Sequence, residues 1–207
     1  MRKVGENVAD KDIIKKLADE CGGVFRTSDL AALGYNTYAI RKIVESQIIE
    51  RIKQGYYRLC KVDEPISEAT QVSQLFPDGV LCMYTALFYY RYSDRTPLEW
   101  NIAVDRDTSK SRFKLDHPFV RPYYMKKEFL TFGVTTADYG DCTIQIFDRD
   151  RLICECVFCE NKMDRETYNK AIQSYVADTK KNVPKLLEYA QKRRVLKKVT
   201  DRIGVWL

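Results

Sequence analysis

The feature that most constrains this chain is an ordered run of short periodic segments within its first sixty residues. Three of them place apolar side chains at helical spacing: residues 12–21, 27–33 and 38–46. Gly22 can adopt the left-handed conformation that ends the first helix, and Asn36 or Thr37 can cap the third. Two β-prone runs then flank Gln54-Gly55. The sequence therefore predicts three short helices followed by a β-hairpin.

This order of elements is typical of a winged helix-turn-helix domain, whose third helix enters the major groove of double-stranded DNA. A polar, proline-containing stretch at residues 61–65 indicates a domain boundary. We therefore predict a DNA-binding winged helix-turn-helix domain in residues 1–62 and a second domain in residues 63–207.

The second domain is predicted to mix helices and strands. Four stretches are β-prone: residues 100–104, 119–124, 130–134 and 143–147. Five others show helical periodicity: residues 67–76, 84–90, 151–158, 165–177 and 183–194. The predicted class is α+β, with an N-terminal winged helix-turn-helix, a C-terminal sheet of about four strands and helices at the C-terminus.

The predicted third helix and hairpin supply the candidate DNA contacts. Arg41 can form two hydrogen bonds to guanine in the major groove, which makes it the leading base-reading residue. Residues near the start of a helix commonly hold phosphates and fix the register of binding. The full predicted set is Arg26, Thr27, Thr37, Tyr38, Arg41, Lys42, Arg51, Lys53 and Gln54.

The net charge of +6 is spread unevenly along the chain. Residues 1–61 carry 12 basic and 8 acidic side chains, and residues 62–179 carry 14 and 19. Residues 180–207 are the most basic, with nine cations and two acids. Basic ends around an acidic middle favour a polyanionic partner, although a basic helix is commonly only a solvated face. The candidates for a second nucleic-acid surface are Lys192, Arg193, Arg194, Lys197 and Lys198.

Metal binding and catalysis find little support. Cys154, Cys156 and Cys159 lie in an apolar helical stretch, and the only histidine, His117, is far upstream, so we expect buried free thiols. Several acids could be drawn into a metal-dependent nuclease centre, but nothing in the sequence makes them converge: Asp105, Asp107, Asp148, Asp150 and Glu160. We predict no catalytic residue, no metal and no cofactor.

The cellular setting follows from cysteine use and hydropathy. The seven cysteines are odd in number and scattered, which fits free thiols in a reducing compartment. No run approaches the roughly 18 apolar residues that a membrane span needs. We expect a cytoplasmic protein without a membrane partner.

Two ordered sets of residues resemble a known family. The N-terminal set comprises residues 24–30, Gly34, residues 38–41 and residues 55–58. The C-terminal set comprises residues 86–87, 132–134, 147–152 and 186–190. In this order the chain resembles AbiEi-type antitoxins of bacterial type IV toxin–antitoxin systems, which act in abortive infection as a phage defence. One departure is Glu155, which stands near the place where the family pattern has an aspartate.

The resemblance implies a dual function. The N-terminal domain would repress the promoter of its own operon by binding inverted repeats, with two copies on the DNA. The C-terminal domain would counteract a nucleotidyltransferase-like toxin without needing a stable complex, and the basic C-terminal residues could serve there. Two alternatives stay open: a metal-dependent enzyme acting on nucleic acid with a winged-helix targeting domain, and a winged-helix module for protein contacts.

Overall fold

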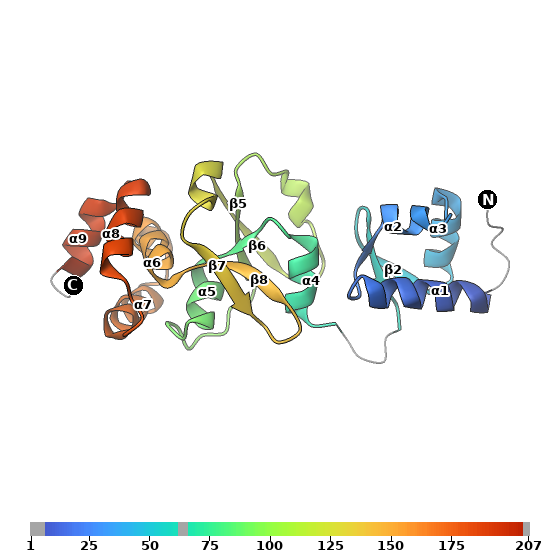
Figure 1. The fold of residues 1–207 in the computed structure, drawn as a ribbon, viewed down its shortest axis with the longest axis horizontal. Coiled ribbons are helices and arrows are strands. Elements are labelled where there is room, and N and C mark those ends of the chain that lie inside the picture. The colour runs from blue at the N-terminus through green and yellow to red at the C-terminus, as the bar shows by residue number, and fades with distance from the viewer. Residues whose placement is uncertain (1–6, 62–65, 205–207) are drawn as a thin grey trace. The chain divides into compact units, whose positions relative to one another are not determined.

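The computed structural model describes residues 7–61 and 66–204 and has an α+β fold (Figure 1). The chain forms two compact units. One consists of Met1–Pro77 with Lys114–Pro118, and the other of Asp78–Phe113 with Phe119–Leu207. The boundary predicted between residues 62 and 63 lies outside the described residues.

The first unit contains the predicted three helices and hairpin. Its elements are α1 (Asn7–Glu20), β1 (Phe25–Arg26), α2 (Thr27–Ala32), α3 (Thr37–Glu45), β2 (Ile49–Lys53), β3 (Tyr56–Leu59) and α4 (Glu68–Leu75). The strands form an antiparallel sheet in the order β1-β3-β2. The hairpin turn lies at Gly55, whose φ of +81° is the left-handed region that glycine adopts most easily.

A small apolar core holds this arrangement together. Ile14 and Leu17 of α1 pack with Leu30 of α2, Ile43 of α3 and Ile49 of β2. Helices this short are marginal by themselves, so packing of their apolar faces provides most of their stability. Because α3 buries only one face in this core, its other face is left outside.

The second unit is built on a five-stranded mixed sheet. Its strands are β4 (Val80–Leu81), β5 (Trp100–Asp105), β6 (Val120–Met125), β7 (Val134–Asp138) and β8 (Thr143–Phe147), in the order β6-β5-β4-β8-β7. The central strand β4 runs antiparallel to β5 and parallel to β8, where Leu81 pairs with Ile146. The sequence predicted about four strands because β4, with two residues, has no periodicity to detect.

The helices of the second unit gather around one buried helix (Figure 1). They are α5 (Met83–Tyr89), α6 (Arg149–Phe158), α7 (Arg165–Ala177), α8 (Val183–Lys192) and α9 (Leu196–Ile203), with short 3-10 turns η1 (Lys110–Phe113), η2 (Lys127–Leu130) and η3 (Glu160–Lys162). The central helix α6 contacts α5, α7, α8 and α9. None of the helices within residues 7–61 and 66–204 has the length and apolar character needed to cross a membrane.

Two sequence predictions for this unit were wrong in detail. The strand expected at residues 130–134 is displaced, because η2 occupies the chain up to Leu130 and β7 starts only at Val134. The helix predicted over residues 183–194 ends at Lys192, and a further helix, α9, follows it.

Candidate nucleic-acid interface

Helix α3 is fixed at its start and presents a polar outer face. The Oδ1 atom of Asn36 accepts a hydrogen bond from the Ala39 amide at 2.8 Å, which satisfies a free donor of the first turn. Ala39, Ile40 and Ile43 are buried. The outer face exposes four of the predicted DNA contacts: Thr37, Tyr38, Arg41 and Lys42. Helix α3 therefore offers hydroxyl and cationic groups from a backbone that its core residues hold in place.

One acid, Glu45, partners both cations of this face. The Nε atom of Arg41 lies 3.0 Å from one carboxylate oxygen of Glu45, and Nζ of Lys42 lies 2.9 Å from the other. The hydrogen bond that Lys42 donates to Glu45 raises the pKa of Lys42, and the same contact lowers the pKa of Glu45. The side chain of Arg41 is 79% exposed. Because all three side chains are exposed to water, breaking either ion pair costs little free energy.

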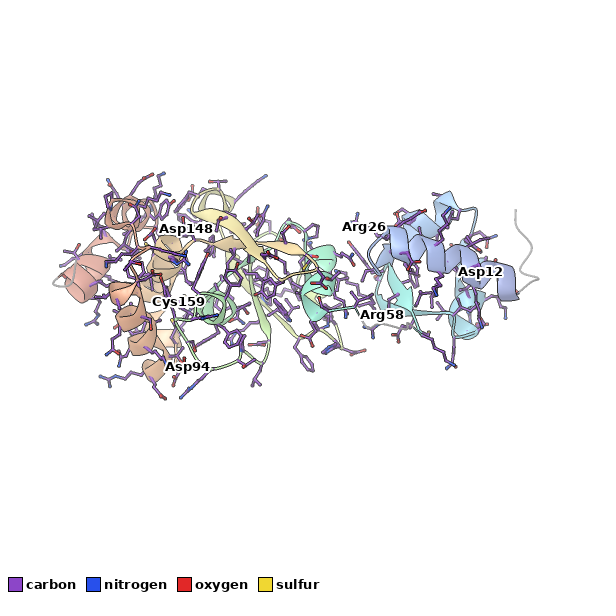
Figure 2. All side chains as sticks on the ribbon, turned by 60° about the horizontal axis from the view of Figure 1, so that its bottom comes forward. Asp12, Arg26, Arg58, Asp94, Asp148 and Cys159 are labelled. Atoms are coloured by element: carbon purple, nitrogen blue, oxygen red, sulfur yellow. The ribbon has the colours of Figure 1, made fainter. Side chains whose placement is uncertain are left out.

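The start of α2 lies beside the hairpin turn. The Thr27 amide donates a hydrogen bond to the Gly55 carbonyl at 3.0 Å. The guanidinium carbon of Arg26 lies 5.5 Å from the ring centroid of Tyr56, and Figure 2 labels Arg26 on this unit. Arg26 and Thr27 are both exposed. These contacts place them beside the hairpin turn, which carries other predicted DNA contacts.

The cations of the hairpin differ in how available they are. Arg51 is exposed and its Nε donates to the Lys53 carbonyl at 3.3 Å, and Gln54 at the turn is exposed as well. Lys53 is half-buried. Its Nζ lies 4.4 Å from the ring centroid of Tyr56 and donates to the Leu75 carbonyl at 3.3 Å. The ammonium of Lys53, one of the predicted DNA contacts, is therefore already held by neighbours of its own unit.

A cross-strand ion pair on this hairpin escaped the sequence analysis. The Nε atom of Arg58 lies 2.6 Å from Glu50 Oε1, and the two residues are directly opposite in the register of β2 and β3. Opposite charges facing each other across two strands are a recognisable signal once the turn at Gly55 fixes the register. Figure 2 labels Arg58.

The basic residues at the C-terminus differ in their exposure. Lys192, Arg194, Lys197 and Lys198 are exposed as predicted. Arg193 is only 8% exposed, and its Nε lies 2.8 Å from Glu155 Oε1. The prediction that Arg193 belongs to a surface was wrong, because a buried carboxylate draws its guanidinium into the interior.

Glu155 bridges two buried arginines. Arg151 is completely buried, and its Nη1 lies 2.6 Å from the same Glu155 Oε1 that Arg193 contacts. Its Nη2 donates to the Phe129 carbonyl at 3.0 Å. Burial lowers the pKa of Arg151, and the nearby Glu155 opposes that shift. The residue that departs from the family pattern is thus part of the internal framework of the second unit.

Two of the five carboxylates that could be drawn into a nuclease centre, Asp148 and Asp150, are engaged in the same framework. Asp148 caps α6 by accepting from the Arg151 amide at 2.8 Å, and Figure 2 labels it at the start of that helix. Asp150 accepts from Tyr175 Oη and from the Asn182 amide, each at 2.8 Å, and burial raises its pKa. These contacts give Asp148 and Asp150 structural roles.

The cysteines predicted to be buried free thiols lie along α6 and at its end. Cys154 and Cys156 are fully buried, whereas Cys159, which Figure 2 labels, is partly exposed. Burial raises the pKa of the Cys154 thiol to about 12, and that of Cys156 well above its usual range. Among the residues that the structure describes, no three or more His, Cys, Asp or Glu side chains gather as metal ligands would.

A comparison with protein families finds a similarity within the first unit. Residues 12–59 match the family described as "Transcriptional regulator, AbiEi antitoxin". The matched segment runs from within α1 to the end of β3, and for these residues it confirms the resemblance to AbiEi-type antitoxins. No curated protein matches the chain significantly. The match supports a transcriptional regulator of the antitoxin type.

Proposed function

We propose that this protein is a DNA-binding autorepressor and the antitoxin of a type IV toxin–antitoxin pair. Residues 1–62 would form the winged helix-turn-helix domain that binds the protein's own promoter, and residues 63–207 would counteract a nucleotidyltransferase-like toxin in phage defence. The observation that carries the DNA-binding half is the outer face of α3, which is polar, cationic and exposed on a helix anchored by its own buried face.

The roles on DNA follow from position. Arg41 stands in the second turn of α3, where a guanidinium can reach guanine in the major groove. Thr37 and Tyr38 open the same helix, where backbone amides and hydroxyls hold phosphates. Arg51 and Gln54 on the hairpin, with Arg26 and Thr27 beside the turn, would contact the DNA backbone. Lys53 would contribute less than Arg51 because its ammonium already has partners.

The proposed DNA site is an inverted repeat read by two copies of the protein. One α3 fills one half-site, so a two-fold repeat requires two α3 helices that lie one turn of the DNA helix, or a multiple of it, apart.

In the second unit, the exposed basic residues are the candidates for the antitoxin or a second nucleic-acid surface: Lys192, Arg194, Lys197 and Lys198.

An electrophoretic shift series over salt concentration tests the assignment on the DNA upstream of the gene and on a random duplex. Arg41→Ala should cost roughly tenfold or more on the promoter and much less on the random duplex, because it removes a base contact. Arg51→Ala should weaken both equally and reduce the salt slope by about one. Lys170→Ala, a cation of α7, is the control and should change neither.

Equal loss on both duplexes for Arg41→Ala would refute its role as a base reader, and a full chain that ignores its promoter would refute the proposed repressor. Co-expression tests the antitoxin half: the full chain should restore growth of cells that produce the toxin from the neighbouring gene.

A further inference from the structure

The second unit carries a hollow beside Lys192 and Arg194, two of its exposed basic residues. It has a volume of about 430 Å³ and is lined by Glu128, Phe129, Thr131, Phe132, Lys192 and Arg194. The first four residues belong to η2 and to the segment between η2 and β7. Lys192 is the last residue of α8, and Arg194 lies two residues after it. The hollow therefore combines two aromatic rings with two positive charges.

The charge around the hollow is positive at the rim and underneath. Lys192 and Arg194 are exposed, and within the described part of the chain the Arg194 side chain has no bonded partner. Lys192 lies 2.6 Å from Glu188. Below the rings, the buried guanidinium groups of Arg151 and Arg193 share the single carboxylate of Glu155. Glu128 is the one acid among the lining residues, and its negative charge reduces the net positive charge of the hollow. A further cation, Lys126, lies 3.6 Å from this carboxylate.

Each ring of the hollow is backed by one of the buried arginines. The guanidinium carbon of Arg151 lies 4.4 Å from the Phe132 centroid, and that of Arg193 lies 4.5 Å from the Phe129 centroid. Because Arg151 and Arg193 are buried, they contact the rings from the protein side. A cation over one face of a ring holds it in place. Both rings are half-buried, and Phe132 also packs against Tyr189 with 5.6 Å between the ring centroids, so stacking would use the part of each ring that is exposed. Planar bases stack on such rings regardless of their sequence.

We infer that this hollow binds a nucleoside phosphate, with the phosphates on Lys192 and Arg194 and the base against Phe129 and Phe132. Its volume lies within the range of small-molecule sites. A double helix does not fit this description, because its bases are stacked inside and cannot reach a ring. The nucleotide can be free or the terminal residue of a single strand. This site goes beyond the proposed promoter binding, since it uses no residue of the first unit.

Binding of a fluorescent methylanthraniloyl derivative of ATP or GTP to the full chain tests the inference. We expect saturable binding that unlabelled ATP or GTP displaces. Adenosine and inorganic tripolyphosphate should each compete at least about tenfold more weakly, because each offers only the base or only the charge. Tripolyphosphate competing as well as ATP would overturn the site as a nucleotide pocket, and so would the absence of saturable binding at millimolar nucleotide.

Matched variants locate the binding. Arg194 has a φ of +61°, a conformation that asparagine also adopts, so Arg194→Asn removes the charge while keeping the backbone. This variant and Lys192→Gln should each weaken nucleotide binding about tenfold. Lys170→Gln removes an exposed cation of α7 outside the hollow and should leave binding unchanged. Equal effects of Arg194→Asn and Lys170→Gln would overturn the assignment.

Single strands with and without a 5′-phosphate distinguish the two sources of the ligand. Competition by the phosphorylated strand that exceeds that of free nucleotide would support a strand end as the ligand. Stronger competition by the free nucleotide would support a soluble ligand. Promoter binding by Arg194→Asn, measured in parallel, keeps a failure of this site separate from a failure of the proposed repressor.

Discussion

Two helices of this protein carry the same pair of residues at the same spacing, with opposite surroundings. Arg41 and Glu45 on α3 lie 3.0 Å apart with side-chain exposures of 79% and 46%. Arg151 and Glu155 on α6 lie 2.6 Å apart with exposures of 0% and 3%. Both pairs join an arginine to a glutamate four residues later. The two pairs therefore have the same residue types and the same sequence spacing, and they differ in how deeply they are buried.

The difference teaches what such a pair can do. In water, an ion pair contributes little and its arginine can leave its partner for a base or a phosphate. In the interior, charges are expensive to leave unpaired, so the same pair becomes a fixed part of the structure. Arg41 is thus available for binding, and Arg151 serves the framework of the second unit.

Removing the buried acid should have the largest effect. Glu155→Gln leaves Arg151 and Arg193 buried without a counter-charge, and we expect it to lower the free energy of unfolding by about 3–5 kcal/mol. Chemical denaturation followed by circular dichroism measures this change. Glu45→Gln, the matched change in the exposed pair, should leave the transition where it is. Similar losses for the two variants would break the comparison.

Crowding the buried arginine should have the next largest effect. Gly133 has a φ of +64°, and a Cβ placed there would lie 2.5 Å from Cβ of Arg151. Gly133→Ala should cost about 2–4 kcal/mol of unfolding free energy, from strain in the backbone and overpacking. Gly140→Ala is the control, because Gly140 has a φ of +86° but no atom within 4 Å of its added Cβ. An equal cost at both positions would show that Arg151 is not tightly held.

The smallest effect is expected at the exposed acid and concerns DNA. Glu45→Gln frees Arg41 and Lys42 and removes a negative charge beside the proposed phosphate contacts. Affinity for promoter and random duplex should both rise, by roughly two- to fivefold at low salt. Titrations at two salt concentrations measure the gain, which should shrink as salt rises. A loss of affinity would mean that Glu45 positions Arg41 for binding.

Much of the local structure was predictable because its signals are local. The cap of α3 at Asn36, the turn at Gly55 and the bounds of the strand at residues 143–147 are all found in the structure. In each case a side chain, a glycine or a short alternation acts on its own neighbours in the sequence. The polar outer face of α3 followed in the same way from helical spacing.

Other features required contacts between distant residues. The strand β4 exists because Val80 pairs with Ala103 and Leu81 pairs with Ile146, and nothing in its two residues announces it. Lys53 was predicted as a DNA contact, but the Leu75 carbonyl and the Tyr56 ring hold its ammonium.

By itself, the sequence determined the three helices and hairpin of the first unit and the polar face of α3, since periodicity and capping act over a few residues. Tertiary structure alone decided which charges are free. In the sequence nothing distinguishes the three neighbouring cations Lys192, Arg193 and Arg194. Only Arg193 is buried, because its guanidinium pairs with the buried carboxylate of Glu155, 38 residues earlier in the chain. The cost of an unpaired buried charge depends on what the fold places beside it, and that is a property of the folded molecule.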